Sequence, residues 1–238
     1  SRRFPPVLRR AGGDRAYRVV LSRHGGRHGH KVGVAWDADV FRLLGEPVEV
    51  VELALDEGLR PALAVRLAHT GKPELDLTVV QVHLKAMPEG YAIRRRQTEI
   101  LAAWIGGWVA AVGDEDVVVM GDFNTTGAPG GTTAAELEDM DSVMGAVGLR
   151  RLANATGCSE YWEGPGPVDG VQVPSLLDLV YVRGLEGVIS GGEVRAWLHC
   201  ARAECEPLVS RPGAEDATFW DVSDHCPLTF EMAVAASP

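Results

Sequence analysis

The chain has 238 residues, of which 46% are hydrophobic and 24% charged, so it has the composition of an ordinary globular protein that can bury a sizeable core. Its formal net charge is −10, whereas a general nucleic-acid binder usually presents a basic surface, so any nucleic acid would have to meet a local basic patch or metal ions. No run of 18 apolar residues is present and the opening SRRFPPVLRR has no apolar secretory-signal region, so we expect no transmembrane helix and see no export signal.

The first third of the chain predicts mainly β-structure. Residues 17–21 and 32–36 have the pattern of two short strands around a long polar loop, as in a hairpin. Residues 48–55, 62–67 and 75–84 follow as further strands, because their apolar residues either alternate or run continuously.

A change of hydrophobic period predicts an amphipathic helix over residues 93–112. Its apolar residues recur at three- and four-residue steps, and Arg94, Arg95, Arg96 and Glu99 are expected on or near its solvent side. No shift in composition marks a linker, so we expect one α+β domain over residues 1–238. The remaining predicted elements are a strand at 116–120, a helix at 134–147, and strands at 176–182, 188–194 and 228–234.

Polar residues stand at or near the ends of several apolar strands. His83 ends one strand, Asp122 and Asn124 follow another in GDFN, and Asp224 with His225 precedes the last. Asp178 lies within the apolar run SLLDLVYV, where an unpaired carboxylate would be costly. Taken singly, such residues are more often turn formers or structural groups. Their combination in this order is far more specific.

These motifs, in this order, resemble those of the endonuclease/exonuclease/phosphatase superfamily, whose best-known member is deoxyribonuclease I. The resemblance rests on HLKA at 83–86, GDFN at 121–124, LLDLVYV at 176–182 and SDHCP at 223–227. GLRPALAV at 58–65 and the helix RRRQTEILAAWI add to it, so that it extends from about residue 17 to the end. The resemblance implies a two-layer β-sandwich flanked by helices, with the active site at one edge.

The resemblance also implies a divalent metal, Mg²⁺ or else Mn²⁺ or Ca²⁺. Asp224 would be a direct metal ligand. Asp122 and Asn124 would orient the attacking water, hold the phosphate or help to bind a second metal. Carboxylate and amide oxygens suit these hard cations, which neutralise the phosphoryl group and polarise it.

The other motif residues would carry proton transfer and phosphate binding. His225 would be the general base or its partner, and Asp178 would pair with or orient a catalytic group. His83 would hydrogen-bond the phosphate or protonate the leaving oxygen, and Arg60 would clamp a phosphate oxygen, with Asn124 as a further phosphate contact.

Two departures from the family pattern stand out. Members usually begin with a strand ending in Asn and a later strand followed by Gln-Glu, whose Glu is a principal metal ligand, yet no such segment precedes Tyr17. We therefore expect the first strands to be missing from this chain and a segment before Ser1 to complete the catalytic unit. In addition, Leu179 follows Asp178, where many relatives have a polar residue.

The motifs define the reaction class more closely than the substrate. The loop at 23–31 holds two Arg, three His and one Lys, and it could contact a phosphate backbone or be a solvated hairpin tip. We expect a phosphodiester-cleaving nuclease that acts as a monomer. The alternatives are a small-molecule or lipid phosphatase or phosphodiesterase of the same fold, and a catalytically degenerate binding domain.

Four cysteines lie in the C-terminal third: Cys158, Cys200, Cys205 and Cys226. Buried free thiols in a cytosolic protein and disulfides in an exported one are both compatible with their spacing. If disulfides form, we expect a small loop closed by Cys200 and Cys205, with Cys158 and Cys226 as a second pair. A metal site of His199, Cys200 and Cys205 is a further alternative.

Overall fold

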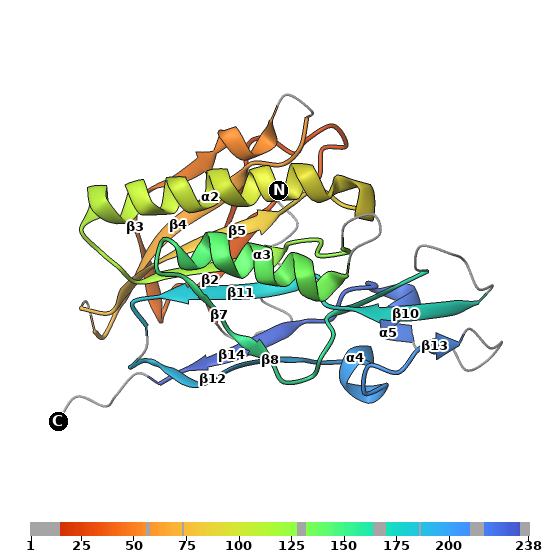
Figure 1. Ribbon diagram of the computed structural model, residues 1–238. Helices are drawn as coiled ribbons and strands as arrows, with labels where there is room; N and C mark the ends of the chain where they lie inside the picture. The colour runs from red at the N-terminus through yellow and green to blue at the C-terminus, as the bar shows by residue number, and fades with distance from the viewer. Residues whose placement is uncertain are drawn as a thin grey trace.

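The computed structural model describes residues 15–55, 58–72, 74–127, 132–163, 170–185, 187–209 and 217–233. A six-stranded sheet with the order β3-β4-β5-β6-β11-β7 runs through the middle of this part of the chain (Figure 1). Its strands are β3 (Phe41–Val50), β4 (Ala62–His69), β5 (Asp76–His83), β6 (Val117–Asp122), β11 (Asp178–Arg183) and β7 (Arg150–Arg151).

The central strands of this sheet are short runs of valine and other aliphatic residues. β5 and β6 pair in parallel, while the other described pairs in this sheet are antiparallel. Strands with both faces covered read as continuous apolar runs, and Val80, Val118 and Val119 are fully buried here. The sequence prediction of buried strands at 75–84 and 116–120 is therefore confirmed.

Two helices cover one face of the central sheet, α2 (Tyr91–Val112) and α3 (Thr133–Gly145), which lie side by side in Figure 1. Gly113 ends α2 in the left-handed conformation with φ of 71°, and Thr132 caps α3 by accepting a hydrogen bond from the Ala135 amide. The core between helices and sheet includes Leu101, Ile105, Val80, Phe123 and Met144.

Arg94 departs from the sequence prediction, which placed it on or near the solvent side of the helix. Its side chain is fully buried between α2 and α3, where it forms a two-pronged ion pair with Glu136 at 2.6 and 3.0 Å. It also donates to the carbonyls of Lys85 and Met87. A buried guanidinium is tolerated because its donors are matched in this way.

Smaller sheets cover the opposite face. The hairpin of β1 (Tyr17–Leu21) and β2 (Gly33–Asp37) confirms the prediction for that segment. A second group has the order β14-β12-β8, from β14 (Leu228–Met232), β12 (Ile189–Ala196) and β8 (Ala153–Asn154). Side chains of both groups pack with the central sheet in one apolar cluster, which includes Val34, Val65, Val180 and Val194.

The strand predicted at 48–55 is wrong in its second half. β3 ends at Val50, and a 3-10 turn, η1 (Val51–Ala54), follows. This turn buries Leu53 in the core between the sheet and the helices. The Gln97 side-chain amide donates a hydrogen bond to the Leu53 carbonyl. Among the described residues no helix has both the length and the apolar character needed to cross a bilayer.

The remaining elements form a cap at one end of the sheets. They are β9 (Glu160–Trp162), β10 (Val171–Ser175), β13 (Leu208–Val209), α4 (His199–Arg202) and α5 (Ala217–Asp221), whereas the short turn η2 (Pro88–Gly90) leads into α2. β13, β10 and β9 form a three-stranded sheet, and two disulfides hold the surrounding segments.

The cysteine pairs are Cys158–Cys205 and Cys200–Cys226, so the predicted partners, Cys200 with Cys205 and Cys158 with Cys226, are wrong. Backbone geometry explains the difference. Cys200 lies in α4 next to Cys226, while the turn after α4 carries Cys205 to the segment at 156–158. All four thiols are used, which also excludes the free-thiol alternative for this structure.

Candidate active site at the edge of the central sheet

Three of the predicted site residues lie on adjacent strands in register. His83 ends β5 opposite Asp122, which ends β6, and Asp122 lies opposite Asp178, which begins the antiparallel β11. Opposed residues on neighbouring strands point to the same face of a sheet. The His83 Nε2 and Asp122 Oδ2 atoms are accordingly 3.3 Å apart.

His225 joins this row from the loop before β14. Its Nδ1 lies 2.7 Å from Asp178 Oδ2, and its Nε2 lies 3.9 Å from Asp122 Oδ2. Ser159 holds the Asp178 backbone in place, because its hydroxyl oxygen accepts a hydrogen bond of 2.9 Å from the Asp178 amide. The result is a carboxylate–imidazole pair whose second ring nitrogen lies on the side of Asp122.

Asn124 is held in the turn after β6 by local hydrogen bonds. Its amide donates to Asp122 Oδ1 at 2.9 Å, and its side-chain Nδ2 donates to the Leu84 carbonyl at 3.2 Å. Gly121 lies within β6, where its φ is 136° and an added Cβ would lie 2.1 Å from the Val82 carbonyl oxygen of the neighbouring β5, so only glycine fits there. This explains why a Gly precedes the Asp in the GDFN segment.

Two further carboxylates, Glu160 and Asp224, lie next to His225. Glu160 and His225 form an isolated antiparallel bridge, and the Tyr161 amide donates to the Asp224 carbonyl at 3.1 Å. One carboxylate oxygen each of Glu160 and Asp224 and one ring nitrogen of His225 all lie within 4.8 Å of one another. Asp224 is exposed, whereas Glu160 is buried.

The crowding of carboxylates changes their proton affinities. Burial, assisted by the nearby Asp178 charge, raises the pKa of Asp122 to about 7. Burial likewise raises the pKa of Glu160 to about 8, with Asp224 and Asp122 adding to the effect. For His225 burial opposes the charged form, but the hydrogen bond to Asp178 and the surrounding carboxylates outweigh it and raise its pKa to about 9.

The opposite side of the site is basic. A cleft of about 660 Å³ is lined by Arg27, His28, Arg60, His83 and Lys85, together with neighbouring backbone of the loops at 25–28 and 58–60. Burial and the Arg60 charge lower the pKa of His83 to about 4, so His83 is neutral at pH 7. The described lining of this cleft contains no carboxylate, which makes it a suitable place for anionic groups.

Arg60 links this cleft to the loop at 23–31. Its Nη2 lies 3.1 Å from His30 Nδ1. Its charge also interacts electrostatically with His83 and with Asp122. The structure thus brings Arg60, His83, Asn124, Asp122, Asp178, Asp224 and His225 into one region of the molecule.

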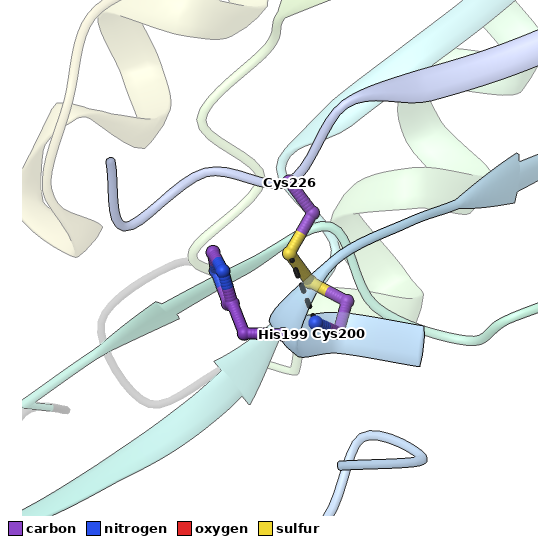
Figure 2. A group of neighbouring side chains, drawn as sticks. All are labelled: His199, Cys200 and Cys226. Carbon is purple, nitrogen blue, oxygen red and sulfur yellow. Dashed lines mark hydrogen bonds between the residues drawn. A yellow bond between two sulfur atoms is a disulfide. The ribbon is translucent and has the colours of Figure 1, made fainter. Parts of the chain in front are cut away.

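The disulfide Cys200–Cys226 joins α4 to the loop before β14 (Figure 2). Cys226 follows His225, and its sulfur accepts from the Cys200 amide at 3.2 Å. His199 lies beside the disulfide and its Nε2 is 3.1 Å from the Asp224 carbonyl oxygen. Because the sulfurs are bonded in disulfides, His199, Cys200 and Cys205 do not form the metal site considered from the sequence.

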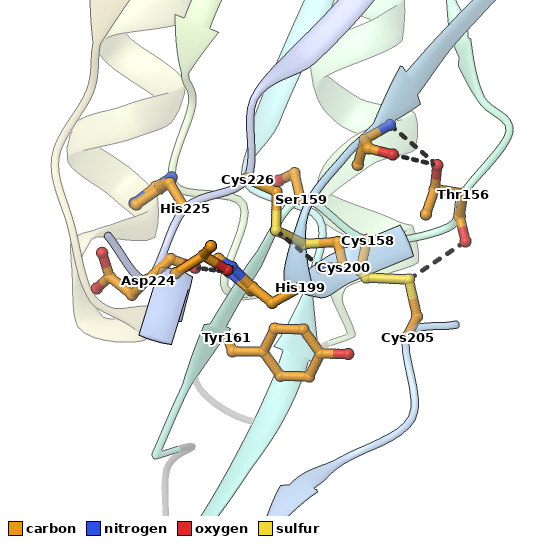
Figure 3. Close-up of a disulfide and its surroundings, with 12 residues drawn as sticks. Thr156, Cys158, Ser159, Tyr161, His199, Cys200, Cys205, Asp224, His225 and Cys226 are labelled. Atoms are coloured by element: carbon orange, nitrogen blue, oxygen red, sulfur yellow. Dashed lines mark hydrogen bonds between the residues drawn. A yellow bond between two sulfur atoms is a disulfide. The ribbon is translucent and has the colours of Figure 1, made fainter. Parts of the chain in front are cut away.

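The second disulfide, Cys158–Cys205, anchors the segment that leads through Ser159 into β9 (Figure 3). The Cys226 amide donates to the Ser159 carbonyl at 2.8 Å, so the two disulfides fix adjacent segments. Sequence reasoning did not identify Ser159 or Glu160 as site residues. The only signal in the sequence is a Ser-Glu pair beside a cysteine, which by itself has no predictive value.

No protein-family model matches this sequence, and no curated protein matches it either. Solved structures do. D. rerio TDP2 complexed with a single-strand DNA product matches with a TM-score of 0.59 and 14% identity over 96% of this chain and 80% of that chain. An endonuclease/exonuclease/phosphatase from Bacteroides vulgatus matches with a TM-score of 0.56 and 16% identity over 94% and 78%.

A mannosyl-6-phosphatase from Bacteroides thetaiotaomicron also matches, with a TM-score of 0.59 and 11% identity over 96% of this chain and 80% of that chain. These likenesses cover nearly the whole chain, and they show that it has the deoxyribonuclease I-like fold of endonuclease/exonuclease/phosphatase structures. One of these structures holds a single-strand DNA product and another is a mannosyl-6-phosphatase, so the fold leaves the substrate open.

Proposed function

We propose that this protein is a divalent-metal-dependent phosphoesterase that hydrolyses phosphodiester bonds. The main supporting observation is that His83, Asp122 and Asp178 lie side by side at the strand ends, with His225 hydrogen-bonded to Asp178. A cleft lined by basic side chains lies next to them. One side of this site can bind a phosphate and the other can bind a cation and move a proton. The deoxyribonuclease I-like fold supports this reading.

The residues present fit a hard divalent cation. Asp224, Asp122 and Asn124 carry the carboxylate and amide oxygens that such ions prefer. Burial, followed by the nearby Asp178 charge, raises the pKa of Asp122, and a bound cation would favour its charged form. When bound, the cation would neutralise the phosphoryl oxygens and polarise the phosphorus centre.

The protein side chains would position the substrate and transfer the proton. Arg60 and neutral His83 would hold non-bridging phosphate oxygens, since both line the basic cleft. Asp178 fixes the His225 ring through Nδ1, so Nε2 is the nitrogen that loses and accepts protons. With a pKa of about 9 the ring is mostly protonated at pH 7 in the absence of metal, and its deprotonated form would be the one that accepts a proton from the attacking water. As the water oxygen bonds to phosphorus, the bond to the leaving oxygen would break. That oxygen would take up a proton from solvent, and His225 would return the proton it accepted to solvent.

Nucleic acid is the substrate class we favour. The cleft joins the site to the basic loop at 23–31, and a similar structure is described in complex with single-strand DNA. A phosphorylated small molecule is the second candidate, because the net charge of −10 opposes the approach of a long polyanion and a similar structure is a mannosyl-6-phosphatase.

A substrate panel tests the proposal. Plasmid DNA, single-strand DNA, RNA, inositol polyphosphates, mannose 6-phosphate and a bis-aryl phosphodiester would be incubated with protein and Mg²⁺ or Mn²⁺, and in parallel with excess EDTA. We expect hydrolysis with metal and none with EDTA. The His225→Ala variant is the matched control for contaminating nuclease. Absence of turnover on every substrate would favour a degenerate binding domain instead.

A further inference from the structure

We infer that Glu160 is a ligand of the divalent cation, which it binds together with Asp224. This inference rests on the proposed function for the role of the metal. It adds a ligand from β9, a strand that contributes none of the sequence motifs. With Glu160, two carboxylates of this chain would bind the cation, whereas the sequence motifs alone supply only Asp224 as a direct ligand.

The state of the Glu160 side chain is the first argument. The residue is only 4% exposed, and its Oε2 atom has no hydrogen-bond partner among the described residues. A buried carboxylate oxygen without a donor is costly, and native proteins seldom leave one unsatisfied. A cation at this oxygen would provide the missing partner.

The distances to its neighbours are the second argument. Carboxylate oxygens of Glu160 and Asp224 and a His225 ring nitrogen lie within 4.8 Å of one another. Ligands on opposite sides of a cation are separated by twice the bond length, which is about 4.2 Å for Mg²⁺ and about 4.8 Å for Ca²⁺. The Glu160 and Asp224 oxygens can therefore reach one ion without rearrangement of the backbone, and exposed Asp224 leaves that ion open to solvent and substrate.

The rigidity of the surroundings is the third argument. Glu160 is paired with the His225 segment by the isolated bridge and by the bonds from Tyr161 to Asp224 and from Cys226 to Ser159. A disulfide lies beside each segment of this arrangement, since Cys158 precedes Ser159 and Cys226 follows His225 (Figure 3). Pre-positioned carboxylates bind a cation without the cost of ordering them.

Glu160 could instead act only as a counter-charge to His225, whose charge it favours. The two roles differ in a direct binding measurement. A counter-charge can be replaced by neutral Gln with little effect on metal affinity. A ligand cannot, because Gln lacks the negative charge that hard cations require.

The test is titration of metal-free protein with Mn²⁺ by calorimetry, using Glu160→Gln, Asp224→Asn and the matched control Glu163→Gln, in which an exposed Glu three residues along the chain is changed. Loss of a group that merely supports a ligand costs about 10–100-fold in affinity, so loss of a ligand should cost at least about 10-fold. We expect that loss in Glu160→Gln and Asp224→Asn, and wild-type affinity in Glu163→Gln.

The outcomes separate this inference from the proposed function. Weakening by Asp224→Asn but not by Glu160→Gln would overturn the role of Glu160 and leave the phosphoesterase proposal standing. Weakening by both, without turnover on any substrate, would support the ligand pair and refute the enzyme. No Mn²⁺ binding by the wild-type protein would overturn both.

A measurement on the unaltered protein covers the case in which Glu160→Gln does not fold. Crystals of the wild-type chain grown with Mn²⁺ would be examined for anomalous scattering. A peak about 2.0–2.6 Å from a Glu160 oxygen supports the inference. A peak bound to Asp224 but more than about 4 Å from Glu160 refutes it.

Discussion

The two disulfides should decide both the stability of the chain and the integrity of its site. Cys200–Cys226 closes a separation of 26 residues and Cys158–Cys205 one of 47 residues. They hold the segments that carry His225 and Ser159 (Figure 3). The perturbation is complete reduction with a phosphine reductant, or substitution of one pair at a time by Ala.

The expected loss follows from the loop lengths. By the chain-entropy relation, the shorter loop contributes about 3.5 kcal/mol and the longer about 4.0 kcal/mol at 25 °C. The loops overlap in sequence, so reduction of both should cost more than about 4 kcal/mol and less than their sum of about 7.5 kcal/mol. Since domains are stable by only about 5–15 kcal/mol, the reduced chain should be marginally folded.

The assay is urea denaturation followed by tryptophan fluorescence, with and without reductant. With an m-value of about 2–3 kcal/mol/M, loss of one disulfide should lower the midpoint by about 1.2–2 M. Peptide mapping under non-reducing conditions should recover the pairs Cys158–Cys205 and Cys200–Cys226. Equal midpoints after reduction verified by thiol titration, or four titratable thiols in the unreduced denatured protein, would refute this reasoning.

Three other predictions follow from the site and its support. Asp178→Asn should lower kcat on the best panel substrate by about 10²–10⁴-fold while the protein still folds, because Asn keeps the side-chain shape but removes the carboxylate that orients His225. A near-normal rate would contradict the pair. Arg94→Leu should destabilise the fold by about 3–5 kcal/mol, because it leaves Glu136 buried and unpaired. In the same denaturation assay, the double variant Arg94→Leu/Glu136→Leu should recover part of that loss. A double variant no more stable than the single one would show that pairing is not the cause. In EDTA the free energy of unfolding should fall as the pH rises from about 6.5 to 9. The reason is that the raised pKa values of Asp122, Glu160 and His225 let the folded state hold protons that the unfolded chain has released. An increase across this window would show that the site does not have these proton affinities.

Local patterns in the sequence were sufficient for the main elements of the central layer. The three- and four-residue period of α2 and the valine runs of β5 and β6 depend only on neighbours along the chain, and each predicted its element closely. The placement of His83 and Asp122 at strand ends came from the same patterns. The strand at 48–55 failed in its second half because packing of Leu53 under α2, which is not local, favours a 3-10 turn there.

Only the tertiary structure decided which distant residues meet. Arg94 appears solvent-facing from its position among charged residues, but α3 brings Glu136 to it across 42 positions of sequence. The cysteine partners and the approach of Glu160 to Asp224 likewise depend on how α4 and β9 pack against the loop before β14. Hydrophobic period and turn preferences describe single elements, whereas pairing of thiols and of buried charges is determined by the relative positions of elements, which a local pattern does not encode.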